Sequence, residues 1–150
     1  MDQLIATQNR ARLKEILSAL RNDTVPVWGR MTPQQMIEHL IDQVEFTSGK
    51  KLYIYDGPAD EAAIQKHKWI YTDAQIPRNL VLAPLPDVCT YPDLQSAINK
   101  LLNELEDFDS FFAEAGTMSD HGAYGAMDYN EWVIWHSKHF RHHFMQFGLL

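Results

Sequence analysis

Apolar residues near the start of the chain recur at spacings of three and four, as they do along one face of a helix. They are Leu4, Ile5, Leu13, Ile16, Leu17 and Leu20. The pattern predicts an amphipathic helix from Asp2 to about Arg21. The polar run at 22–24 and Pro26 are expected to end it, because proline lacks the N–H that a helix interior requires.

Three further helices are predicted from stronger signals. In Thr32-Pro33-Gln34-Gln35 a capping threonine precedes proline at the first helical position, and a glutamine follows three residues after the cap. This helix is expected to reach about Gly49. A leucine- and phenylalanine-rich stripe predicts a helix over 93–115, followed by a glycine-bearing loop at 118–126. The last helix is predicted over 128–146, with Asp128 and Glu131 forming a capping box.

The connection between the second and third helices is unusually long. Residues 50–92 hold five of the seven prolines, and they allow one short helix at about 60–69. A connection of this length exceeds the usual loop and lets the next helix begin at the far end of the fold. Four long helices with one crossover therefore indicate an all-α four-helix bundle that forms a single domain over residues 1–150.

Charge and composition exclude several classes of protein. The net charge is −7, from 20 acidic and 13 basic residues, so binding to nucleic acid or to an anionic membrane surface is disfavoured. No apolar run reaches the roughly 18 residues that a membrane-spanning helix needs. The single cysteine, Cys89, precludes an internal disulfide and fits a cytoplasmic protein.

Histidines are the main candidates for chemistry. His139 and His143 lie four residues apart on the predicted last helix, so both imidazoles project from one face and could share a metal ion. A third ligand has to come from another element, and His39, midway along the second helix, is the best supplier. Three neutral imidazoles leave coordination positions open to water or substrate, as in catalytic metal sites.

Other side chains of the last helix could surround this site. They are Trp132, Trp135, His136, His142 and Gln146. His136 and His142 each lie three residues from His139, so either could replace His143 as its partner; His136 could instead orient a ligand or touch the substrate.

The same residues have simpler interpretations. A histidine pair on a helix is often surface decoration, and a lone His39 is often a hydrogen-bonded core residue. His67 is expected to face solvent and His121 to fix its loop. Glu38, one residue from His39, is expected on a solvated helix face.

Two stretches of the chain resemble a known superfamily. They are Trp28-Gly29-Arg30-Met31-Thr32-Pro33-Gln34-Gln35-Met36-Ile37-Glu38-His39-Leu40, and His121-Gly122-Ala123-Tyr124-Gly125-Ala126-Met127 followed by Glu131-Trp132 and the run 139–148. In these the chain resembles the DinB/YfiT-like superfamily, and within it an uncharacterised bacterial branch. That branch usually has proline at the position of Gly122 and phenylalanine at that of Tyr124.

The resemblance implies a fold, a metal site and a type of reaction. It implies an up-up-down-down four-helix bundle, often dimeric, whose metal triad maps onto His39, His139 and His143. Characterised relatives include thiol-dependent S-transferases, which use a metal to activate a low-molecular-weight thiol, and some relatives are described as hydrolases. We therefore expect a homodimeric enzyme that uses a divalent metal ion, zinc or nickel, on a small-molecule substrate. The rival interpretation is a non-catalytic dimeric bundle or small-molecule binding protein with a structural or incidental metal.

Overall fold

The computed structural model describes residues 6–78 and 88–150. Within these residues the elements are α1 (Arg10–Leu17), α2 (Pro33–Glu45), α3 (Ala59–Ile70), α4 (Leu94–Phe111), β1 (Ser119–His121), β2 (Gly125–Met127) and α5 (Tyr129–Gln146). Helices account for about half of the described residues, so the prediction of an α-rich fold is confirmed. None of the described helices is long and apolar enough to cross a membrane.

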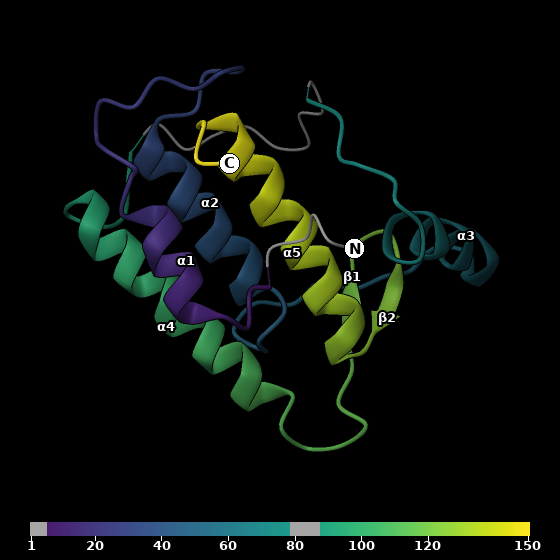
Figure 1. The fold of residues 1–150 in the computed structure, drawn as a ribbon. Coiled ribbons are helices and arrows are strands. Elements are labelled where there is room, and N and C mark those ends of the chain that lie inside the picture. Colours follow the sequence, from purple (N-terminus) through teal and green to yellow (C-terminus); the bar gives the residue numbers. More distant parts are fainter. Residues whose placement is uncertain (1–5, 79–87) are drawn as a thin grey trace.

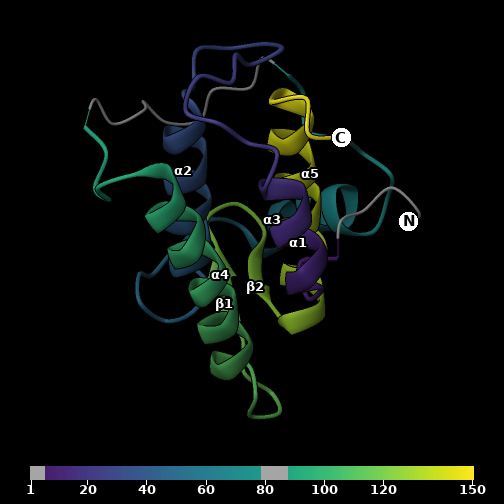
Figure 2. The same cartoon turned by 60° about the vertical axis from the view of Figure 1, so that its left-hand side comes forward.

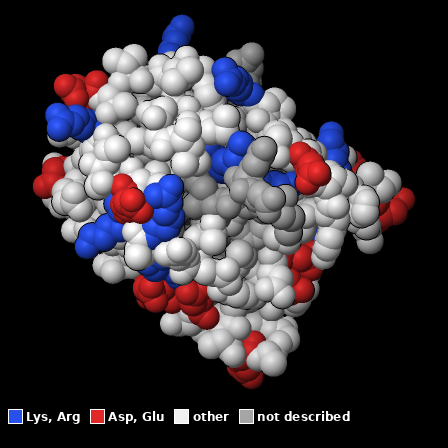
Figure 3. Space-filling model, viewed as in Figure 1, with Lys and Arg blue, Asp and Glu red and all other residues white. Residues whose placement is uncertain are grey.

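Four of the helices surround a common core. Buried side chains from α1, α2, α4 and α5 form one hydrophobic cluster, which also includes Ile70 at the end of α3 and the hairpin residues Tyr124 and Met127; α2 packs most extensively on α4. Figures 1 and 2 show α3 outside this group, beyond α5 and the β1–β2 hairpin. On the face drawn in Figure 3, acidic and basic side chains are interspersed, and no large basic patch is visible.

Helix α1 is shorter than the predicted 2–21. It begins at Arg10 because the side chain of Asn9 accepts a hydrogen bond from the backbone N–H of Arg12 and caps the helix there. After Leu17 the backbone tightens into a turn, in which the N–H of Leu20 bonds to the carbonyl of Leu17. This turn still places Leu20 in the core. The predicted start at Asp2 lies outside the described residues.

The capping box that starts α2 is confirmed. Thr32 accepts from the Gln35 backbone at 3.1 Å, and the Gln35 side chain accepts from the Thr32 backbone at 2.9 Å. The helix ends at Glu45, before the predicted stop at Gly49. Gly49 has φ +79°, and a Cβ there would lie 2.7 Å from the ring of Phe111. Its role is therefore a left-handed turn that packs closely against α4.

The long connection contains α3, close to the predicted 60–69. Lys138, a residue of α5 that is only 6% exposed, fixes the C-terminal end of α3. The Lys138 ammonium donates to the carbonyls of Trp69 at 2.6 Å, Thr72 at 2.7 Å and Ala74 at 3.1 Å. Since the last carbonyls of a helix have no partner within it, Lys138 acts as a cap supplied by another element.

The predicted loop at 118–126 is instead a β-hairpin. β1 pairs antiparallel with β2, with Asp120 opposite Ala126. Strands of three residues are too short to show an alternating pattern in the sequence. The indole Nε1–H of Trp132 donates to the carbonyl of Ser119 at 3.0 Å and holds the hairpin against α5.

Helices α4 and α5 begin where the caps predict. Asp93 accepts from the backbone N–H of Ser96 at 2.7 Å, and Asp128 from that of Glu131 at 2.9 Å. The predicted capping box at Asp128 is only half formed, because the Glu131 carboxylate pairs with Lys66 at 3.0 Å and does not bond back to the Asp128 backbone. α4 ends at Phe111 and does not reach the predicted residue 115, because the chain tightens into an i to i−3 turn after the helix. α5 ends at Gln146, as predicted.

Candidate metal centre

Three histidines from two helices converge at the boundary of the core. Nε2 of His139 lies 3.0 Å from Nε2 of His39 and 3.0 Å from Nε2 of His143. Among the described residues, one nitrogen from each ring can be chosen so that all three lie within 4.8 Å of one another. The structure therefore brings together the three residues that the sequence and the resemblance indicate.

Local packing explains the convergence. His139 and His143 are one turn apart on α5, and the fully buried Phe140 and Phe144 anchor that helix on its core side. His39 lies beside the fully buried Leu40, which anchors α2 in the same way. The three rings meet edge to face, with centroids between 4.8 and 5.0 Å apart. The aromatic core thus positions the helices so that the imidazoles point at one another.

Burial keeps the three imidazoles neutral. Desolvation lowers the pKa of His143 to about 3 and lowers the pKa of His39. For His139, desolvation and then the neighbouring His143 and His39 lower the pKa well below its ordinary 6.5. All three rings are therefore unprotonated at neutral pH, and each has a nitrogen lone pair to offer a metal ion.

Three neutral imidazoles carry too few ring protons to form a hydrogen bond at every close nitrogen pair in this cluster. Nδ1 of His143 lies 2.7 Å from the side-chain oxygen of Gln146, which can only accept, so the ring proton of His143 is on Nδ1. Its Nε2 is then a bare lone pair facing His139. Nδ1 of His139 is buried without a hydrogen-bond partner.

These observations fit a cation among the three rings. Zinc–nitrogen bonds of about 2.0–2.1 Å in tetrahedral geometry place neighbouring nitrogens about 3.3 Å apart. The observed 3.0 Å separations at His139 are close to that value, while the set of three nitrogens spans up to 4.8 Å, so a bound ion would draw the rings closer together. Nitrogen-only ligands suit zinc, nickel and copper better than magnesium or calcium.

Trp135 and Trp132 were both expected near the site, but only Trp135 lies next to the three histidines. The Trp135 ring lies against His139, with centroids 6.1 Å apart and planes at 20°, and it packs edge to face with the rings of His121 and Tyr124, each with centroids 5.3 Å away. Trp132 is buried under the hairpin. Trp135 therefore covers one side of the triad, and Trp132 supports the element that covers Trp135.

His136 lies in the core rather than with the triad. The hydroxyl of Thr47 donates to the carbonyl of Val44, so it accepts from Nε2–H of His136 at 3.0 Å. The ring packs against Phe108 and Trp132, is 1% exposed, and has its pKa lowered by burial to about 3. It does not replace His143 as a partner of His139.

His142 lies about 120° around α5 from His136, on the other side of His139. Its ring packs edge to face with the rings of His143 and Trp28, with centroids 5.0 and 5.5 Å away. Burial lowers its pKa, although a hydrogen bond with the backbone of Ile76 opposes the shift. The guanidinium of Arg78 lies 4.4 Å from the centroid of the Trp28 ring, on this same side. His142 thus belongs to the surroundings of the triad.

The other histidines lie as predicted. His67 on α3 is exposed. Nδ1 of His121 accepts from the backbone N–H groups of Ala123 at 3.0 Å and Tyr124 at 3.2 Å, which fixes the hairpin turn. The His121 and Tyr124 rings stack at 3.7 Å. Neither His67 nor His121 joins the triad.

The expectation for Glu38 was wrong. Its side chain is 9% exposed and accepts from the backbone N–H groups of Thr90 at 2.6 Å and Tyr91 at 3.2 Å. Burial raises the pKa of this carboxyl, but these bonds and one from Gln34 outweigh it, so the pKa is lowered. Glu38 holds the end of the long connection against α2. Nothing in its own neighbourhood of the sequence indicates that distant partner.

Sequence reasoning also missed what holds Gln146. Its side-chain NH2 donates to the carbonyl of Trp28 at 3.1 Å, and its backbone carbonyl accepts from Val27 at 2.7 Å. Trp28 and Gly29 entered the sequence argument only through the family resemblance. The sequence signal that could have indicated this contact is Gly29, which follows Trp28 shortly before the helix cap at Thr32.

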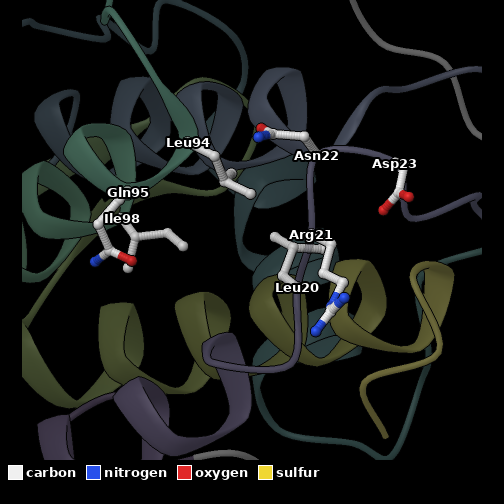
Figure 4. A pocket seen from close by; sticks show the side chains of 7 residues that line it. All are labelled: Leu20, Arg21, Asn22, Asp23, Leu94, Gln95 and Ile98. Atoms are coloured by element: carbon white, nitrogen blue, oxygen red, sulfur yellow. The ribbon is translucent and has the colours of Figure 1, made fainter.

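A surface depression lies elsewhere. Figure 4 shows it between the segment that follows α1 and the start of α4. Its volume is about 560 Å³, and it is lined by Leu20, Arg21, Asn22, Asp23, Leu94, Gln95 and Ile98. No histidine lines it, so it is separate from the candidate metal centre.

Comparison with known proteins gives one match. No curated protein and no solved structure matches the chain. Residues 71–148 match a family described as a protein of unknown function (DUF1569), and they include His139, His143 and Gln146 but not His39. Because the matched segment covers more than half of the 150 residues, the chain belongs to the DUF1569 family.

Proposed function

We propose that His39, His139 and His143 bind one divalent metal ion, zinc or nickel, and that the protein is a metal-dependent enzyme. The observation that supports the proposal most strongly is the approach of His139 Nε2 to two other imidazole nitrogens at 3.0 Å each. Neutral imidazoles brought this close share too few protons to satisfy one another, whereas a cation accepts a lone pair from each.

The reaction proposed is thiol-dependent group transfer, with a related hydrolysis as the alternative. A metal held by three neutral imidazoles keeps coordination positions open and lowers the pKa of a thiol or water bound there. The protein's own residues hold and orient the ion, and Trp135 shields His139 from one side. The substrate proposed is a small molecule used with a low-molecular-weight thiol.

The fold is proposed to be of the DinB/YfiT-like kind. In this view α1, α2, α4 and α5 form an up-up-down-down four-helix bundle, and residues 50–92, with α3, form its long crossover. The shared core of these four helices supports the proposal; α3 lies beside them in Figure 1 and reaches the core through Ile70 at its C-terminal end. The enzyme is proposed to act as a homodimer.

The test begins with metal content. Protein purified without a metal-affinity tag is analysed for zinc and nickel, before and after loading, beside His39→Ala, His139→Ala and His143→Ala. We expect about one ion per chain in the wild type and a loss of at least tenfold in affinity in each variant, because two ligands are too few for a stable site. His67→Ala is the matched control, since His67 is exposed on α3.

Two results would overturn parts of the proposal. Equal metal content in all four variants would show that the triad is not the site. A metal-loaded wild type that transfers no thiol to any electrophile in a broad panel, and hydrolyses none, would leave a non-catalytic bundle or binding protein with a structural metal.

A further inference from the structure

The side chain of Gln146 has both ends of its carboxamide in use. Its oxygen lies 2.7 Å from Nδ1 of His143, and its NH2 group donates to the carbonyl of Trp28 at 3.1 Å. The residue is 6% exposed, so water has little access to replace either bond. A backbone carbonyl can only accept, which means the NH2 end must face Trp28 and the oxygen end must face His143.

The backbone at Gly29 makes this arrangement possible. Gly29 has φ +76°, a conformation that side-chain-bearing residues rarely adopt. A Cβ there would also lie 2.9 Å from the Gln146 nitrogen, closer than real contacts allow. Since Val27 donates its backbone N–H to the Gln146 carbonyl at 2.7 Å, the segment 27–29 holds both the backbone and the side chain of Gln146.

The direction of the carboxamide decides which nitrogen of His143 is protonated. An oxygen acceptor at Nδ1 requires the proton there, so Nε2 keeps its lone pair and points it at His139. With the opposite orientation, Nε2 would carry a proton and could not bind a metal ion. A hydrogen bond on the distal nitrogen is how proteins commonly fix a ligating histidine.

We propose that Gln146 is a positioning residue that holds His143 in the Nδ1–H tautomer, and that the Trp28–Gly29 backbone sets the orientation of Gln146. The effect on metal affinity rests on the proposed function, whereas the tautomer of His143 does not. Trp28 and Gly29 lie outside the segment 71–148 that matches the family, as His39 does. The amino-terminal part of the chain therefore supplies one ligand and the control of another.

The tautomer is tested directly in metal-free protein. Nitrogen NMR of the imidazoles at pH 7.5 should show His143 protonated on Nδ1, and His136, which donates to Thr47, protonated on Nε2 as an internal control. In Gln146→Leu, His143 should move to Nε2–H while His136 stays unchanged. Wild-type His143 protonated on Nε2 would overturn the proposal without any variant needing to fold.

Metal affinity gives the second readout. Zinc should bind Gln146→Leu 10- to 100-fold more weakly than the wild type, the loss typical of removing an outer hydrogen bond to a ligating histidine. Gln34→Leu is the matched control, because Gln34 also bonds a side chain, Glu38, and a backbone carbonyl, that of Tyr91. Equal losses in both variants would show a merely structural role. Gln146→Glu should restore part of the affinity, since a carboxylate also accepts from Nδ1–H.

The role of the amino-terminal segment is tested by Gly29→Ala. We expect a measurable fraction of His143 in the Nε2–H tautomer and weaker zinc binding, although no ligand is altered. An unchanged tautomer and affinity would overturn this half of the proposal. A wild type that binds no zinc but has His143 in the Nδ1–H form would contradict the proposed function and leave the assignment of Gln146 intact.

Discussion

Replacing Lys138 by methionine should release α3 from α5 without unfolding the core. Lys138 donates to the carbonyls of Trp69, Thr72 and Ala74, and methionine fills a similar volume with no donor. The three carbonyls lie at and just beyond the C-terminal end of α3, where helix carbonyls lack partners of their own. The substitution therefore removes a cap and leaves the apolar contacts in place.

The size of the loss in Lys138→Met depends on how exposed the three carbonyl acceptors are. Thr72 is exposed and Ala74 and Trp69 are half-buried, so water can replace part of what is lost. Leaving one buried acceptor unsatisfied costs about 1–3 kcal/mol. Burial lowers the pKa of Lys138, an effect that Asp73 partly opposes, so the wild type also bears a desolvation cost that methionine removes. We expect a net loss of about 2 kcal/mol in the docking of α3, or roughly 30-fold in its opening equilibrium.

Amide hydrogen exchange can measure this locally. In Lys138→Met the amide of Tyr71, which bonds the carbonyl of His67 within α3, should exchange about 30-fold faster. Amides of Leu101 and Leu105 in α4 should be almost unchanged. Lys68→Met is the control, because Lys68 is exposed on the same helix. Equal acceleration in α3 and α4 would mean that Lys138 stabilises the whole core, and no acceleration would refute the capping role.

Two further predictions concern stability. Burial lowers the pKa of His136 and of His143 to about 3, so between pH 6.5 and pH 3 these histidines take up protons in the unfolded chain but not in the folded one. The free energy of unfolding of metal-free protein should therefore fall by about 2 kcal/mol per histidine between pH 7 and pH 5. Urea unfolding measures this change. A flat profile would show that these rings are more solvated than their burial implies. Glu104 is fully buried and forms ion pairs with Lys50 at 2.8 Å and Lys100 at 2.6 Å. Glu104→Gln should therefore lower the free energy of unfolding by about 3 kcal/mol, as measured by thermal unfolding. A loss below about 1 kcal/mol would contradict a stabilising role for these ion pairs.

Local signals in the sequence predicted much of the helical framework. Caps such as Thr32 with Gln35 and Asp128 act within a few residues, so their partners are visible in the sequence itself. The histidine pair of α5 was visible for the same reason, because a spacing of four fixes which side chains share a face. His39 could be chosen as the third candidate ligand from its place in an amphipathic helix together with the resemblance.

Features that depend on distant partners could not be predicted. The sequence around Glu38 predicts a polar helix face, because the backbone N–H groups that bind its carboxylate belong to residues 90–91. A lysine such as Lys138 is expected at the surface, and only the fold shows that three carbonyls at the end of α3 bind its ammonium group. In both cases a charged side chain is buried because backbone groups satisfy it, and those groups carry no side-chain signature.

The separation of the three histidines along the chain has a consequence for unfolding. His39 and His139 are 100 residues apart, so an ion held between them closes a loop that spans most of the protein. Unfolding separates these histidines, so the ion binds only the folded chain and stabilises it by mass action, by about 2.7 kcal/mol when the free ion is at 100 times its Kd. If the triad binds metal as proposed, the metal supply would set the stability of the folded protein, and a chelator would act as a destabilising agent.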